Sequence, residues 1–95
     1  MAACRLDLRI PGAASLKEKR HVVKTLTSSL RQKFNVAVAE VDHQDLWQRA
    51  TLGVSAVAGE GYHLKRVMHE VRRHVDSFAG VELIDADVSI HSPDD

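Results

Sequence analysis

The sequence has little of what builds disulfide frameworks, aromatic binding sites or membrane spans. Its 95 residues include one cysteine, two prolines and only 4% aromatic residues. A single cysteine excludes an internal disulfide and a cysteine-based zinc site. No apolar run approaches the roughly 20 residues of a transmembrane helix, and no basic and apolar secretory signal is found. We therefore expect a cytoplasmic protein with a core of Val, Leu, Ile and Ala.

The charged residues balance overall but are unevenly distributed. The formal net charge is zero, so no excess of one sign draws the whole protein to nucleic acid or membrane. Residues 15–33 nevertheless include six basic residues and one acidic residue, whereas residues 80–95 include five acidic residues and no Lys or Arg. The length predicts one domain, which we place at residues 1–91, with a flexible tail at 92–95.

Apolar periodicity predicts six elements in the order β-α-β-β-α-β. A hydrophobic residue at every second position is typical of a half-buried strand, and one at every third or fourth position is typical of an amphipathic helix. Two helices with one apolar face each and four half-polar strands predict a ferredoxin-like α+β sandwich, with an antiparallel sheet of order 4-1-3-2. The predicted strands are 4–10, 36–41, 50–57 and 81–90, and the predicted helices are 15–33 and 64–78.

Three details of this pattern predict side-chain positions. Ser15 and Glu18 have the spacing of a capping box at the start of the first helix. Lys19 falls inside the apolar arc of that helix, so we expect its stem to be buried and its ammonium to reach solvent or a carboxylate of the Asp42 loop. The residues expected to face the core in the last strand are Ile84, Ala86, Val88 and Ile90.

The ten residues from Glu40 to Arg49 concentrate functional side chains. Such a cluster could bind a divalent cation or act in acid–base catalysis. Strand alternation, however, places Glu40 with Asp42 and opposite His43, and no nucleophile is evident. The alternative is a structural connection with polar turn contacts and Trp47 packed against the helices. We assign no catalytic residue, metal site or cofactor, and leave the role of six residues open: Glu40, Asp42, His43, Asp45, Trp47 and Arg49.

Basic residues on the first helix are candidates for binding phosphate. At about 100° per residue, four of them fall within about 60° of one another, and such a stripe can follow a nucleic-acid backbone. The predicted topology also brings the helix start beside residues 42–45 and 72–74. The alternatives are a solvated helix face and internal pairing with Asp42 or Asp45. The candidate phosphate contacts are Lys17, Lys19, Arg20, Lys24, Arg31, Arg72 and Arg73.

The uncovered face of the predicted sheet has no Phe, Tyr or Trp on its strands. Stacking of RNA bases on this sheet face is therefore not expected. Its small residues of mixed charge suit a homodimer contact, another protein partner or solvent.

Three motifs resemble the YlxP-like family of small bacterial proteins of unknown function. They are Ser15-Leu-Lys-Glu-Lys-Arg20, Lys33-Phe-Asn-Val36 and the segment from Ala39 to Ala50. The resemblance covers nearly the whole chain and implies a ferredoxin-like fold. Genes of that family often lie beside those for transcription elongation, translation initiation and ribosome maturation factors, and no catalytic residue is established in it. We therefore predict a non-enzymatic RNA- or ribosome-associated module. The alternative is a homodimeric or protein-binding module that uses the open sheet face or an edge strand.

Overall fold

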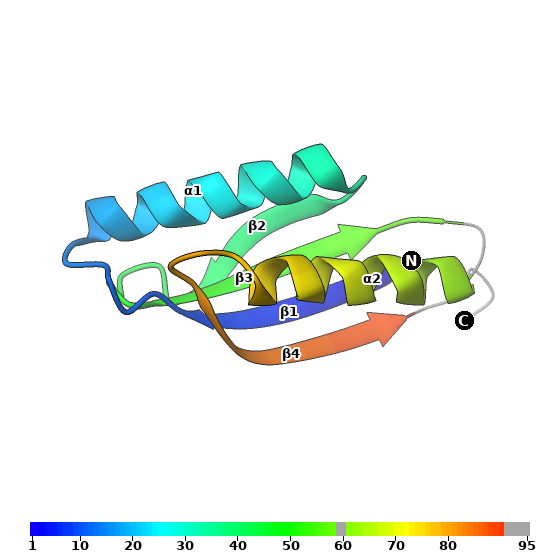
Figure 1. Cartoon of the computed structure of the whole chain (residues 1–95). Coiled ribbons are helices and arrows are strands. Elements are labelled where there is room, and N and C mark those ends of the chain that lie inside the picture. The colour runs from blue at the N-terminus through cyan, green and yellow to red at the C-terminus, as the bar shows by residue number, and fades with distance from the viewer. Residues whose placement is uncertain (59–60, 91–95) are drawn as a thin grey trace.

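The computed structural model describes residues 1–58 and 61–90, which follow the predicted order of elements (Figure 1). The four strands form one antiparallel sheet of order β2-β3-β1-β4, which is the predicted order read from the opposite edge. The ferredoxin-like prediction is thus confirmed, while the tail predicted at 92–95 lies outside the described residues. The elements are β1 (Ala2–Arg9), α1 (Leu16–Lys33), β2 (Ala37–Asp42), β3 (Arg49–Ala56), α2 (Gly61–Asp76) and β4 (Glu82–Ile90).

Both helices cover the same face of the sheet, and the core lies between the two layers (Figure 1). Alternation in β1 and β3 sends every second side chain into this core, which explains why Leu6, Leu8 and Leu52 are fully buried. Burying one large aliphatic side chain contributes about 1.5–3 kcal/mol. No helix within residues 1–58 and 61–90 is both long and apolar enough to cross a membrane.

The start of α1 is capped as its sequence predicts. Ser15 Oγ accepts a hydrogen bond from the Glu18 amide at 3.2 Å, and Glu18 Oε2 accepts one from the Ala14 amide at 2.6 Å. The Glu18 carboxylate thereby occupies the helix N-terminus, where the unpaired amides and the helix dipole favour a negative group. The helix ends with Phe34 as its C-cap, one residue before the predicted Asn35.

A β-bulge in β2 overturns the predicted direction of one acidic side chain. Glu40 pairs with Leu52 and Asp42 pairs with Thr51, so Val41 is the additional residue. Because an extra residue shifts the alternation that follows it, Glu40 lies on the helix side of the sheet and Asp42 on the open side. The prediction that these two carboxylates share one side is wrong.

A second bulge, in β4, changes which apolar residue meets the core. Asp7 pairs with Asp85 while Leu8 pairs with Leu83, which leaves Ile84 without a partner on β1. The predicted inward position of Ile84 is wrong: its side chain is exposed, and Leu83 packs against the core instead. Val88 is also largely exposed, because β4 is an edge strand.

Candidate functional site

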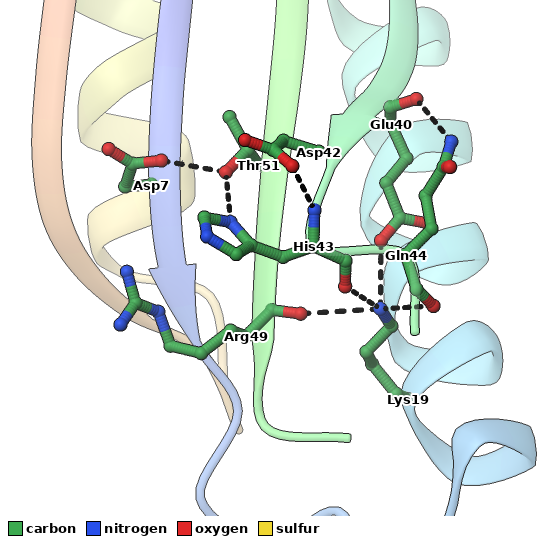
Figure 2. A network of polar contacts seen from close by, with 8 residues as sticks. All are labelled: Asp7, Lys19, Glu40, Asp42, His43, Gln44, Arg49 and Thr51. Atoms are coloured by element: carbon green, nitrogen blue, oxygen red, sulfur yellow. Dashed lines mark hydrogen bonds and ion pairs between the residues drawn. The ribbon is translucent and has the colours of Figure 1, made fainter. Parts of the chain in front are cut away.

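A buried lysine joins the start of α1 to the connection between β2 and β3 (Figure 2). Lys19 is 0% exposed, and its Nζ lies 2.9 Å from Glu40 Oε2 in an ion pair. The same ammonium donates to the carbonyl oxygens of His43, Gln44 and Arg49 at 2.7, 3.1 and 3.2 Å. An ammonium has three protons, and the three carbonyls use them, so Glu40 Oε2 neutralises the charge without a well-aligned hydrogen bond.

This arrangement removes Lys19 from the set of residues able to contact phosphate. Its ammonium is buried and fully engaged, so no RNA phosphate can reach it in this structure. Pairing with a carboxylate near the Asp42 loop was one of the two expected outcomes, and the partner is Glu40 rather than Asp42 or Asp45. A buried charge is tolerated only with such compensation, so residues 43–49 fold around it.

A second network holds His43 on the open side of the sheet (Figure 2). Thr51 is fully buried, and its Oγ1 donates to Asp7 Oδ1 at 2.7 Å. The same oxygen lies 2.8 Å from His43 Nδ1. Because the hydroxyl proton is directed to Asp7, Nδ1 must carry the proton of this second bond. The ring is thus oriented by Thr51, and its Nδ1 is bonded to this hydroxyl rather than to Asp42 or Asp45, the neighbouring carboxylates that acid–base catalysis could have used.

The backbone of His43 is held by its neighbour Asp42. His43 has a φ of 59°, a left-handed conformation that is uncommon for a residue with a Cβ. Its amide donates to Asp42 Oδ1 at 2.8 Å, and Asp42 Oδ2 lies 3.3 Å from Arg5 Nη2. The amide hydrogen bond from His43, together with the charges of His43 and Arg5, holds the pKa of Asp42 below its usual value. Asp42 therefore acts as an ionised acceptor in the turn.

The surroundings of His43 do not favour a cation. Arg49 lies opposite Arg9 in the sheet register, and the buried Arg49 Nε has no hydrogen-bond partner among the described residues. Figure 2 shows the Arg49 side chain on the same side of the sheet as His43 and Asp7. Within the described ranges, no group of three or more His, Cys, Asp or Glu side chains is placed to hold a metal ion.

The loop between β2 and β3 exposes two large apolar side chains at its tip. Leu46 is 48% exposed and Trp47 is 54% exposed. The expectation that Trp47 packs against the helices is therefore wrong. The short apolar pair Leu46 and Trp47, which stands between Asp45 and Gln48 outside any periodic pattern, is the sequence signal that could have predicted a surface tip.

Hydrogen bonds join the β2–β3 loop to the segment that precedes α1. Gln48 Nε2 donates to the carbonyl oxygens of Pro11 and Ala13 at 3.3 and 3.2 Å. The Gln48 carbonyl accepts from the Ile10 amide at 2.9 Å, and Leu46 donates its amide to the His43 carbonyl at 3.1 Å. Sequence reasoning missed Gln48 and Thr51, because both act through partners more than 30 residues away.

The basic residues of α1 run along an exposed side of the helix that reaches the edge strand β2. Lys17, Arg20, Lys24 and Arg31 are all exposed. Arg31 Nη2 donates to the Val38 carbonyl at 2.6 Å, which places the far end of the stripe over β2. These are the four residues of the predicted stripe, and we call them the basic stripe.

The end of α2 does not join the start of α1, contrary to the prediction. His74 Nε2 lies 2.7 Å from Ser29 Oγ, and the His74 ring meets Phe34 edge-on at 5.9 Å between centroids. Arg73 lines a hollow together with Lys33. Figure 1 shows that the N-terminal turns of α1 extend well beyond the last turn of α2. Residues 72–74 therefore lie beside the C-terminal turns of α1.

The two candidate arginines of α2, Arg72 and Arg73, are accordingly separate from the start of α1. Arg73 lies 3.9 Å from Glu70, whereas Arg72 is close enough to Cys4 for its charge to act on the thiol. Burial, and then the charge of Asp87, raises the pKa of Cys4 to about 11. A thiol with so high a pKa stays protonated near neutrality and is a poor nucleophile.

Comparison with known families matches residues 1–88 to DUF503, described as a protein of unknown function. The chain belongs to the DUF503 family. It is also similar to the uncharacterized protein YlxP of Bacillus subtilis (strain 168), with 39% identity over 70 residues that cover 74% of this chain and 76% of that protein. These matches confirm the resemblance found in the motifs. Neither description names an activity, so a function has to be argued from the surface.

Proposed function

We propose that this DUF503 protein is a non-enzymatic RNA- or ribosome-associated module that contacts phosphates through the basic stripe. One observation carries the proposal: Lys17, Arg20, Lys24 and Arg31 are exposed on one helix whose only acidic residue is Glu18. From Lys17 to Arg31 the stripe spans about 20 Å at 1.5 Å per residue. A nucleic-acid strand passes several phosphates over such a length.

The contacts of the chemically reactive side chains support the non-enzymatic part of the proposal. Cys4 is buried with a raised pKa, His43 Nδ1 is bonded to Thr51, and Asp42 is paired with Arg5. Each of these groups serves the fold. The association with the ribosome rests on the gene neighbourhood that the YlxP-like resemblance implies.

Salt-dependent binding of a structured RNA tests the proposal. We expect fluorescence anisotropy to give a Kd that rises steeply between about 50 and 200 mM salt, because bound phosphates release counterions. Lys17→Gln, Arg20→Gln and Lys24→Gln should each weaken binding and lower the salt slope by about one. The matched control is Lys65→Gln, an exposed lysine of α2. Equal losses of RNA affinity in the control and in the stripe variants would contradict a specific role for α1.

A homodimer through the open face of the sheet is the second candidate. This face carries a hollow of about 480 Å³ over Gly53, with small side chains around it and Val41 at its side. Arg5 and Asp87 face each other across neighbouring strands and could pair with the same residues of a second copy in a two-fold contact. Sedimentation equilibrium should then give a dimer that Arg5→Glu dissociates, whereas a monomer at millimolar concentration would exclude it.

A further inference from the structure

Trp47 is exposed in a loop whose residues on either side are held by hydrogen bonds. It is the only tryptophan of the chain, and 54% of its surface is exposed beside the equally uncovered Leu46. A large exposed aromatic is costly to leave in water and is enriched at recognition sites. Trp47 is not among the residues of the hydrophobic core or packed against it, so the role of this side chain lies outside the core.

The loop around Trp47 is ordered before any partner arrives. The Lys19 ammonium binds the carbonyls on both sides of the tip, at His43, Gln44 and Arg49. The next residue, Gln48, is fixed by two hydrogen bonds from its side chain. A platform that is already ordered loses little conformational entropy on binding, which favours recognition by an exposed ring.

The basic stripe and this loop lie next to each other at the start of α1. Lys19 contacts the loop, and the neighbouring residue Arg20 is exposed at the same level of α1. The far end of the stripe contacts β2 at Val38, and β2 leads directly into the loop. Figure 2 shows the first turns of α1 beside the β2–β3 connection. A strand whose phosphates follow the stripe towards the helix start therefore approaches the loop that carries Trp47.

We propose that Trp47 stacks on an unpaired nucleobase of an RNA whose phosphates bind Lys17, Arg20 and Lys24. This inference rests on the proposed function and names its ligand class, which is single-stranded RNA or the unpaired loop of a folded RNA. Bases inside a duplex have both faces covered, and the deep, narrow major groove of an RNA duplex does not admit side chains. Stacking on an exposed aromatic contributes about 5- to 150-fold in affinity per base, and every base offers a face for it.

The fluorescence of this single tryptophan provides a direct test. A single-stranded oligoribonucleotide should quench the emission of Trp47, while a duplex of equal length should bind more weakly and leave the emission unchanged. Trp47→Ala should lower the affinity for the single strand about 5- to 150-fold, and Trp47→Phe should restore part of the loss. The matched control is Val57→Ala, which removes another exposed apolar side chain and should change nothing.

Two further outcomes separate this inference from the proposed function. If the oligonucleotide binds with a salt dependence that Lys24→Gln reduces, but Trp47→Ala binds equally well without any change of emission in the parent protein, stacking is excluded and the phosphate-binding role stands. If neither single-stranded nor structured RNA binds at low salt, both ideas are excluded. Burial of Trp47 by a protein partner, with no RNA affinity, would overturn the inference as well.

Discussion

Lys19 and Glu40 form an ion pair of 2.9 Å that joins α1 to the last part of β2. The pair exists because regular alternation from Val38 leaves Glu40 on the helix side of the sheet, where it meets a lysine that the helical pattern had placed in the apolar arc. The bulge at Val41 then turns Asp42 away to the open side. Three loop carbonyls complete the surroundings of the ammonium. One buried charge therefore determines the shape of the connection that displays Trp47.

Replacing this lysine should destabilise the protein strongly. Lys19→Met keeps the apolar stem but leaves the Glu40 carboxylate and three carbonyls without their donor, and breaking a buried pair from one side costs about 3–5 kcal/mol. Urea denaturation should show this loss in the free energy of unfolding. The control Lys24→Met removes an exposed charge of the same helix and should change stability by less than about 0.5 kcal/mol. Equal stability of the two variants would show that the network does not stabilise the fold.

The buried hydroxyl between Asp7 and His43 should also be needed for stability. Thr51→Val preserves the shape but removes the donor to Asp7 Oδ1 and the acceptor for His43 Nδ1. Leaving such groups unpaired costs about 1–3 kcal/mol, measurable as a lower urea midpoint. Thr25→Val is the matched control, because its hydroxyl is exposed and bonds only the His21 carbonyl of its own helix. A Thr51→Val protein as stable as this control would contradict the role of the network.

Stability should decrease in mildly acidic solution because of His74. Burial, and then the charge of Lys33, lowers the pKa of His74 from its ordinary value of 6.5. The unfolded chain therefore binds a proton at His74 more readily than the folded protein does. The contribution of neutral His74 to the free energy of unfolding is complete above pH 6.5 and is lost as the pH falls from 6.5 through the lower folded pKa.

Thermal unfolding of two histidine variants checks this pH dependence. The decrease in Tm between about pH 8 and about pH 5 should be smaller in His74→Gln than in the parent protein. His69→Gln, at an exposed position of the same helix, should keep the full decrease. If both variants respond to acid like the parent, His74 is not the group responsible.

The thiol of Cys4 should be nearly inert in the folded protein. Its side chain is buried and its pKa is raised to about 11, so almost no thiolate exists near pH 8. Reaction with a disulfide reagent should be slow under native conditions and should accelerate to the rate of a free cysteine in denaturant. A native rate equal to that of the unfolded chain would show that Cys4 is accessible.

The order of the elements and the composition of the core were determined by the sequence alone. Cys4, Leu6 and Leu8 alternate with charged residues, and the spacing of apolar residues in α1 and α2 leaves one covered face on each helix. These are local properties of the backbone periods, 2.0 in a strand and 3.6 in a helix, so they can be read without knowing any distant partner. The capping box of Ser15 and Glu18 is local in the same way.

Only the tertiary structure decided where the functional side chains point. Two bulges reversed the expected directions of Asp42 and Ile84, because an extra residue in one strand is defined by its pairing with another. The contacts of Lys19 and Thr51 join segments 24 to 44 residues apart, and no local pattern specifies them. Trp47 lies exposed in a loop whose carbonyls bind a buried ammonium, a long-range electrostatic contact that the ten residues from Glu40 to Arg49 do not reveal by themselves.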